Sequence, residues 1–253
     1  MITTYHRPQT LDEALNLLTK ANRIPLGGGT LLSKPTADSI EVVDLQALSL
    51  DSIKKNGNYL ELGATVTLQQ MLESDLCPAP LRSALKLEAP LNIRNAATIA
   101  GTLVACDGRS TFASMLLAAD AKIEQASLKD SQVEYQTTNI GEFLPLRPTR
   151  LITKISLPMN IRLAFDYVAR TPSDKPIVCA ALAQWNSGRT RLVLGGYGKN
   201  PLLAMDGTEA EGVEVAARNA FHEAADDYAS AEYRMDVAAT LAKRCLEALS
   251  ANS

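Results

Sequence analysis

The amino-acid sequence predicts an α+β protein whose C-terminal end is closed by helices. Three observations lead to this class. Residues 1–53 alternate between helical and strand patterns, residues 54–158 open on a strand of alternating polarity, and the chain turns strongly helical after a last run of strands. The length fits two domains, which we place at residues 1–158, with the two segments above as subdomains, and at residues 159–253.

The first segment is expected to open with a capped helix. Thr10-Leu11-Asp12-Glu13 has the pattern of a capping box. The apolar stripe of the helix would consist of Leu11, Ala14, Leu15 and Leu18. A short buried strand is predicted at Ile24–Leu26, directly before Gly27-Gly28-Gly29-Thr30. A parallel strand at residues 41–45 would then place the glycine turn at the edge of a sheet.

The second and third segments supply further helices and strands. Polarity alternates over residues 59–64, and helices are expected at residues 68–72 and 81–87. A small three-stranded antiparallel sheet is predicted from residues 164–170, 178–185 and 191–194. The C-terminal helix would bury a stripe formed by Tyr233, Val237, Leu241, Cys245 and Leu249.

Composition excludes several classes of protein. The 253 residues carry a formal net charge of −3 and are 46% hydrophobic, as is usual for a soluble globular protein. Lys and Arg are scattered, which argues against nucleic-acid binding. With no signal-peptide pattern and no apolar run of membrane-spanning length, we expect a cytoplasmic protein that does not bind membranes. The dispersed Cys77, Cys106, Cys179 and Cys245 and only two histidines indicate buried thiols, with no metal site and no histidine-based triad.

The triple glycine is the first candidate for a binding site. Glycines permit a positive φ and let main-chain N–H groups converge on an anion, most often a phosphate. The sequence alone leaves an ordinary turn as an alternative. A second small-residue segment, Ile93–Val104, is predicted as a loop and has a hydroxyl on each side of Gly101. Two such loops from separate subdomains would be able to clamp a pyrophosphate between them.

These motifs are similar to those of a known family. The family pattern A-G-G-T-[DN]-L is matched from Gly27 to Leu32, and I-R-N-x-A-T-I-G-G-N is matched from Ile93 to Thr102. Further matches lie at Tyr5–Leu18, Leu151–Pro158, Leu194–Gly196 and Ser230–Arg234. The chain thus resembles the FAD-binding, or medium, subunit of the molybdenum hydroxylases, the family of xanthine dehydrogenase and carbon monoxide dehydrogenase.

The resemblance implies a fold, a cofactor and a set of binding residues. The fold would be a two-subdomain FAD-binding domain of the p-cresol-methylhydroxylase type, followed by the small sheet and helical C-terminal domain. The main chain of both loops would bind the FAD pyrophosphate through Leu26, Gly27, Gly28, Gly29, Thr30 and Leu31, and through Thr98, Ile99, Ala100, Gly101 and Thr102. The adenosine ribose would lie against Ser110 and Thr111, where the family has a carboxylate, with Asp107 as a substitute acceptor. Ile152 would lie in the strand beside the isoalloxazine ring.

The resemblance also implies a function. The flavin would perform the chemistry, and no residue of the chain is assigned as catalytic acid, base or nucleophile. Electrons would pass between an iron–sulfur partner and an acceptor such as NAD, in a hetero-oligomer that also contains a molybdopterin subunit. The sequence leaves two alternatives to such a subunit open: a stand-alone flavoprotein, and a scaffold that keeps the fold without a flavin.

Overall fold

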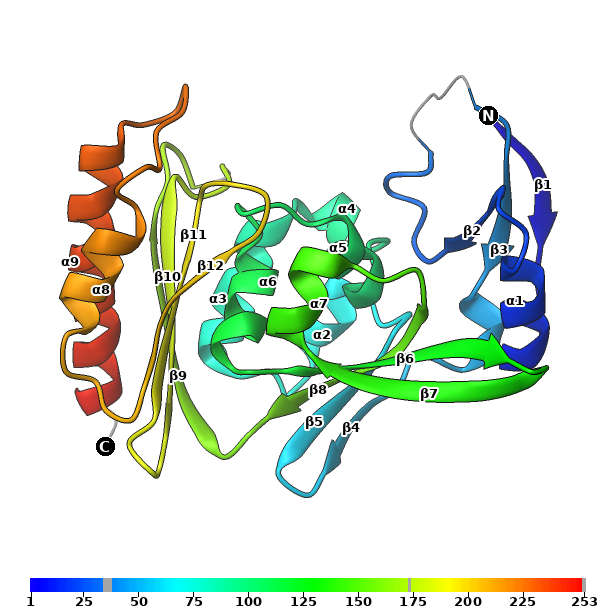
Figure 1. Cartoon of the computed structure of the whole chain (residues 1–253), viewed down its shortest axis with the longest axis horizontal. Coiled ribbons are helices and arrows are strands. Elements are labelled where there is room, and N and C mark those ends of the chain that lie inside the picture. The colour runs from blue at the N-terminus through cyan, green and yellow to red at the C-terminus, as the bar shows by residue number, and fades with distance from the viewer. Residues whose placement is uncertain (34–37, 173, 252–253) are drawn as a thin grey trace.

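The computed structural model describes residues 1–33, 38–172 and 174–251, which form three sheets with interspersed helices (Figure 1). The first sheet has the order β1-β3-β2 and is entirely parallel. Its elements are β1 (Ile2–His6), α1 (Leu11–Leu18), β2 (Arg23–Leu26) and β3 (Ile40–Asp44). The predicted parallel pair is therefore confirmed. The prediction that Ile24–Leu26 is buried is wrong, because β2 is the edge strand of a small sheet and stays half-exposed.

The helix α1 begins where the sequence predicts. The Thr10 hydroxyl accepts a hydrogen bond from the N–H of Glu13. The Glu13 carboxylate reaches back one residue further than a capping box requires and accepts from the N–H of Gln9 at 2.9 Å. Ala14 and Leu15 are buried, and Leu15 packs in a small core with Leu45, Ala126 and Leu151.

A five-stranded antiparallel sheet forms the second layer, in the order β4-β5-β8-β6-β7. Its strands are β4 (Ile53–Asn56), β5 (Tyr59–Gly63), β6 (Lys122–Lys129), β7 (Gln132–Asn139) and β8 (Leu151–Pro158). The associated helices are η1 (Gln46–Leu48), α2 (Leu68–Glu73), α3 (Ala79–Glu88), α4 (Leu91–Arg94), α5 (Ile99–Ala105), α6 (Thr111–Ala118) and α7 (Ile140–Leu146). The hairpin β6–β7 was not predicted, because most of β7 is exposed and lacks an apolar face.

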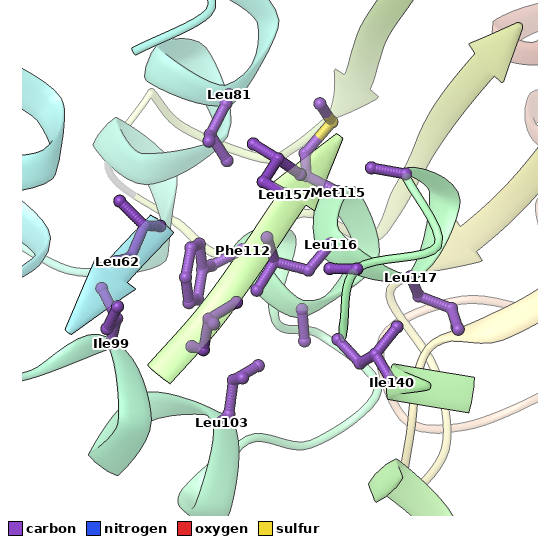
Figure 2. Packing of buried hydrophobic residues seen from close by; sticks show 14 of the residues in the cluster. Leu62, Leu81, Ile99, Leu103, Phe112, Met115, Leu116, Leu117, Ile140 and Leu157 are labelled. Carbon is purple, nitrogen blue, oxygen red and sulfur yellow. The ribbon is translucent and has the colours of Figure 1, made fainter. Parts of the chain in front are cut away.

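The largest core lies where helices pack on this sheet. Every residue of α6 is buried. Figure 2 shows the Phe112 ring of α6 among the side chains of Leu62, Leu157 and Leu116, with Ile99 and Leu103 of α5 nearby. This core fixes α5 and α6 in place, and both helices begin with residues that were predicted to bind the cofactor.

The C-terminal sheet has four antiparallel strands, not three, in the order β12-β11-β10-β9. They are β9 (Ile161–Val168), β10 (Val178–Trp185), β11 (Thr190–Gly195) and β12 (Leu202–Gly207). The fourth strand was missed because it is a half-exposed edge strand without clear alternation. Helices α8 (Val213–Ala220) and α9 (Ala231–Ala251) pack together against this sheet and share a core with it (Figure 1).

The stripe predicted for α9 is correct only in its C-terminal half. Leu241, Cys245 and Leu249 are buried, whereas Tyr233 is 43% exposed. Residues four apart advance by more than one full turn, so a stripe extended over the whole helix rotates off the buried face. Arg234 takes the buried position, with its guanidinium hydrogen-bonded to the carbonyl of Ala224. Among the described residues, neither α9 nor any other helix has the length and apolarity needed to cross a membrane.

Candidate functional site

The two predicted loops lie against each other. A Cβ added to Gly28 would lie 1.6 Å from the carbonyl oxygen of Ala96, and one added to Gly27 would lie 2.6 Å from the Thr98 hydroxyl oxygen. In Figure 1 the chain after β2 extends toward α4 and α5. Gly29 has a φ of +68°, which also favours glycine. Gly28 is therefore required by the close approach of two backbones, Gly27 by its contact with the Thr98 side chain, and Gly29 by its left-handed conformation.

Residues 27–30, here called the glycine loop, have main-chain N–H groups that can donate hydrogen bonds. Within residues 1–33, 38–172 and 174–251, no hydrogen bond uses the N–H groups of Gly28, Gly29 or Thr30. Two of the loop's carbonyls are occupied: that of Gly29 accepts from the N–H of Ser33, and that of Gly27 accepts from the Gln46 side chain. Consecutive N–H groups in a turn containing a left-handed residue form a concave anion-binding surface.

The second segment is a helix start, which corrects the prediction of a loop over Ile93–Val104. Thr98 is the N-cap of α5, and its hydroxyl oxygen accepts from the N–H of Gly101 at 3.1 Å. The small residues and the glycine suggested a loop, but at Gly101 an added Cβ would lie 2.9 Å from the hydroxyl oxygen of Thr98, the cap of the same helix. The other N–H groups also have partners: Ile99 with the Val66 carbonyl, Ala100 with the Ala64 carbonyl, and Thr102 with the Thr98 carbonyl. Because all four N–H groups are bonded within the fold, this segment forms a wall beside the glycine loop.

Ser110 and Thr111 are bonded within the fold. Both side chains are fully buried at the start of α6. The Ser110 hydroxyl donates to the Glu88 carboxylate at 2.8 Å, and the Thr111 hydroxyl donates to the Ala84 carbonyl at 2.7 Å. Both hydroxyls are thus already engaged within the fold, an arrangement that disfavours the expected contact with the adenosine ribose.

Glu88 is a buried residue that the sequence reading missed. One of its oxygens accepts from Ser110, from Thr111 and from the N–H of Phe112. The carboxylate thus holds the N-terminus of α6, where negative charge is favoured by the helix dipole. The available signal was its spacing, because Glu88 follows Leu81 and Ala84 on the apolar face of α3.

The remaining predicted residues differ in exposure. Asp107 is exposed, accepts from the N–H of Arg109 at 2.9 Å and lies 3.9 Å from the Lys175 ammonium. Leu31 is 50% exposed, Leu26 is half-buried at the end of β2, and Ile152 is buried in β8. Asp107 therefore remains able to meet a ligand. Ile152 packs in the core of the five-stranded sheet.

Side chains at the edge of the first sheet contact the glycine loop, and the sequence analysis did not predict them. The carboxyl ends of β1, β2 and β3 meet at one edge, where the Gln46 amide donates to the Gly27 carbonyl at 3.3 Å. The main-chain N–H of Gln46 donates to the buried carboxylate of Asp44, which also accepts from the Tyr5 hydroxyl. That hydrogen bond to Asp44 raises the pKa of Tyr5. The contacts of Gln46 with Gly27 and of Tyr5 with Asp44 have no local sequence pattern, because they join residues 19 and 39 positions apart.

The chain is similar to known proteins along most of its length. The model of a family described as the FAD binding domain in molybdopterin dehydrogenase matches residues 1–160. The uncharacterized protein YgfM of Escherichia coli is 28% identical over 250 residues, spanning 95% of this chain and 94% of that protein. The carbon monoxide dehydrogenase medium chain of Afipia carboxidovorans is 25% identical over 276 residues, spanning 96% and 95%. The solved CO dehydrogenase from Oligotropha carboxidovorans has the same fold, with a TM-score of 0.82, 24% identity, and coverage of 99% of this chain and 98% of that one.

Proposed function

Because the chain belongs to the family of FAD-binding domains of molybdopterin dehydrogenases, we propose that it relays electrons within a molybdenum-hydroxylase-type oxidoreductase. The resemblance inferred from the two motifs is confirmed. The cofactor is FAD, and relatives with an assigned activity are dehydrogenases or subunits of them. Our proposal concerns the residues that hold the FAD, the partner subunits and the direction of electron flow.

The glycine loop is the single observation that carries the proposal. At Gly28 there is no room for a Cβ, and the N–H groups of Gly28, Gly29 and Thr30 have no partner among the residues that the structure describes. A pyrophosphate needs both close approach and several donors, and the loop supplies both. We assign these three N–H groups to the FAD pyrophosphate, with Thr98 and the start of α5 as the adjoining wall.

The chain's contribution is to bind and orient the cofactor. FAD, when bound, supplies the capacity to accept and release electrons. Of the residues expected near the adenosine, Asp107 keeps an exposed carboxylate able to accept hydrogen bonds from a ribose. This group replaces the carboxylate that the family places where Thr111 stands in this chain.

Partners are inferred from the cysteines and from the relatives. The four thiols are buried, and burial raises the pKa of Cys106 to about 11 and that of Cys245 to about 12. Such thiols are poor ligands for an iron–sulfur cluster, which binds thiolates. We therefore propose that an iron–sulfur subunit and a molybdopterin subunit accompany this chain, and that electrons leave to an acceptor such as NAD.

The flavin is tested by purifying the chain and recording its absorption spectrum. The proposal predicts absorption bands at about 370 and 450 nm, typical of a bound flavin, and release of FAD when the protein is denatured. A colourless protein that takes up no added FAD would contradict the assignment and favour the cofactor-free scaffold.

The partners are tested by affinity purification from the native host. The proposal predicts that proteins containing iron–sulfur clusters and molybdenum are recovered together with the chain. Recovery of the chain with its flavin and without such proteins would favour the stand-alone flavoprotein.

A further inference from the structure

Gln46 is the only side chain among the described residues that hydrogen-bonds to the main chain of Gly27, Gly28 or Gly29. Its amide nitrogen lies 3.3 Å from the Gly27 carbonyl oxygen. We propose that Gln46 is a positioning residue, which turns the Gly27–Gly28 peptide so that its N–H faces the FAD pyrophosphate. This inference rests on the proposed function and deepens it.

The geometry of the peptide group makes the connection. In a planar trans peptide the C=O and the following N–H point in opposite directions. Holding the Gly27 carbonyl toward Gln46 therefore points the N–H of Gly28 away from Gln46. A peptide between two glycines rotates easily, and the rotated form would present a carbonyl oxygen to the anion. The hydrogen bond from Gln46 selects the orientation that donates.

Gln46 is itself held in position by the first sheet. It begins η1 directly after β3, and its own N–H donates to Asp44 Oδ1 at 3.0 Å. Asp44 is buried, and its carboxylate accepts from the Tyr5 hydroxyl and lies 3.6 Å from the Arg7 guanidinium. Residues at the carboxyl ends of β1 and β3 thus act on the loop that follows β2, through one exposed amide.

Because Gln46 is exposed, it can be replaced without disturbing the packing of the core. Gln46→Met keeps the length of the side chain and removes the donor, without leaving a cavity. Gln46→Glu keeps the shape but cannot donate when ionised, and it adds a negative charge beside the pyrophosphate. We expect Gln46→Met to raise the dissociation constant for FAD about three- to tenfold, as for loss of one neutral hydrogen bond, and Gln46→Glu to raise it further.

The experiment titrates FAD into the apo form of the whole chain, for the wild type, both variants and a Gln136→Met control. Gln136 is an exposed glutamine of β7, so its replacement is expected to leave FAD affinity unchanged. The thermal unfolding temperature of each apo-protein and the absorption spectrum of its bound flavin should match those of the wild type. A purely structural role would change one or both.

The outcomes separate the inference from the proposed function. Equal FAD affinity in the wild type and Gln46→Met, an equal loss in the Gln136→Met control, or a matching loss of apo-protein stability would overturn the role of Gln46 alone. A wild-type chain that binds no FAD would overturn the proposed function and this inference together.

Discussion

The glycine loop and the start of α5 have similar composition, yet their backbones are used differently. Both are rich in small residues and both were expected to donate N–H groups to one pyrophosphate. At Gly28, Gly29 and Thr30 the N–H groups stay free within the described residues, whereas those of Ile99 to Thr102 are bonded within the fold. The free backbone donors therefore distinguish the loop that we propose to bind the pyrophosphate from the segment that we propose as its wall, although both look alike in sequence.

The largest effect is expected from a methyl group on the glycine loop. In Gly28→Ala the new Cβ would meet the Ala96 carbonyl, so the two segments must separate and the donors lose their placement. Overpacking of rigid backbone costs several kcal/mol, so we expect FAD affinity to fall at least about 100-fold, as measured by titration.

Gly141→Ala is the matched control for this substitution. A Cβ there would make only ordinary contact with Leu117, at 3.6 Å, inside α7. Its FAD affinity should equal that of the wild type. Unchanged affinity in Gly28→Ala would remove the glycine loop from the site.

The second-largest effect is expected on stability, at the first residue of α6. Thr111→Val keeps the shape but removes a buried hydroxyl bonded to Ala84 and Glu88. We expect the free energy of unfolding to fall by about 2 kcal/mol, because buried acceptors lose their partner, with no change in FAD affinity. Urea denaturation and FAD titration test both parts, and a variant of normal stability that binds FAD weakly would restore the predicted ribose contact.

A smaller effect is expected at the wall. Thr98→Ala removes the cap of α5, for which losses of about 1 kcal/mol are typical. Because the wall contributes shape and not donors, FAD affinity should stay within about threefold of the wild type, a range below 1 kcal/mol. A loss as large as that in Gly28→Ala would show that the two segments share the same role.

The smallest effect that we expect is a pH dependence of the stability of the first sheet, which precedes and follows the glycine loop. His6 and then Arg23 lower the pKa of Glu41, in β3, to about 2. A lowered folded-state pKa gives stability that is present above the unfolded value, about 4.3, and is lost as pH falls toward 2. Glu41→Gln should thus be less stable than the wild type at pH 6, and the difference should shrink as the pH falls from about 4 toward 2. A difference in urea denaturation that stays undiminished down to pH 2 would contradict this origin.

The sequence predicted what depends on local pattern and missed what depends on distant contacts. The cap at Thr10, the bounds of β10 and the pairing of the two loops follow from neighbouring residues and from recognisable motifs. The edge strand β12, the carboxylate of Glu88 and the amide of Gln46 act through partners elsewhere in the chain. Their roles appear only when the strands and helices are assembled.

Amide hydrogen exchange in the apo and FAD-bound forms tests the central claim most directly. Hydrogen-bonded N–H groups exchange slowly and free ones exchange fast. The account predicts that, without FAD, Gly28 to Thr30 exchange fast while Ile99 to Thr102 are protected, and that FAD protects mainly Gly28 to Thr30. Protection gained only at Ile99 to Thr102, or a glycine loop already protected without FAD, would contradict it.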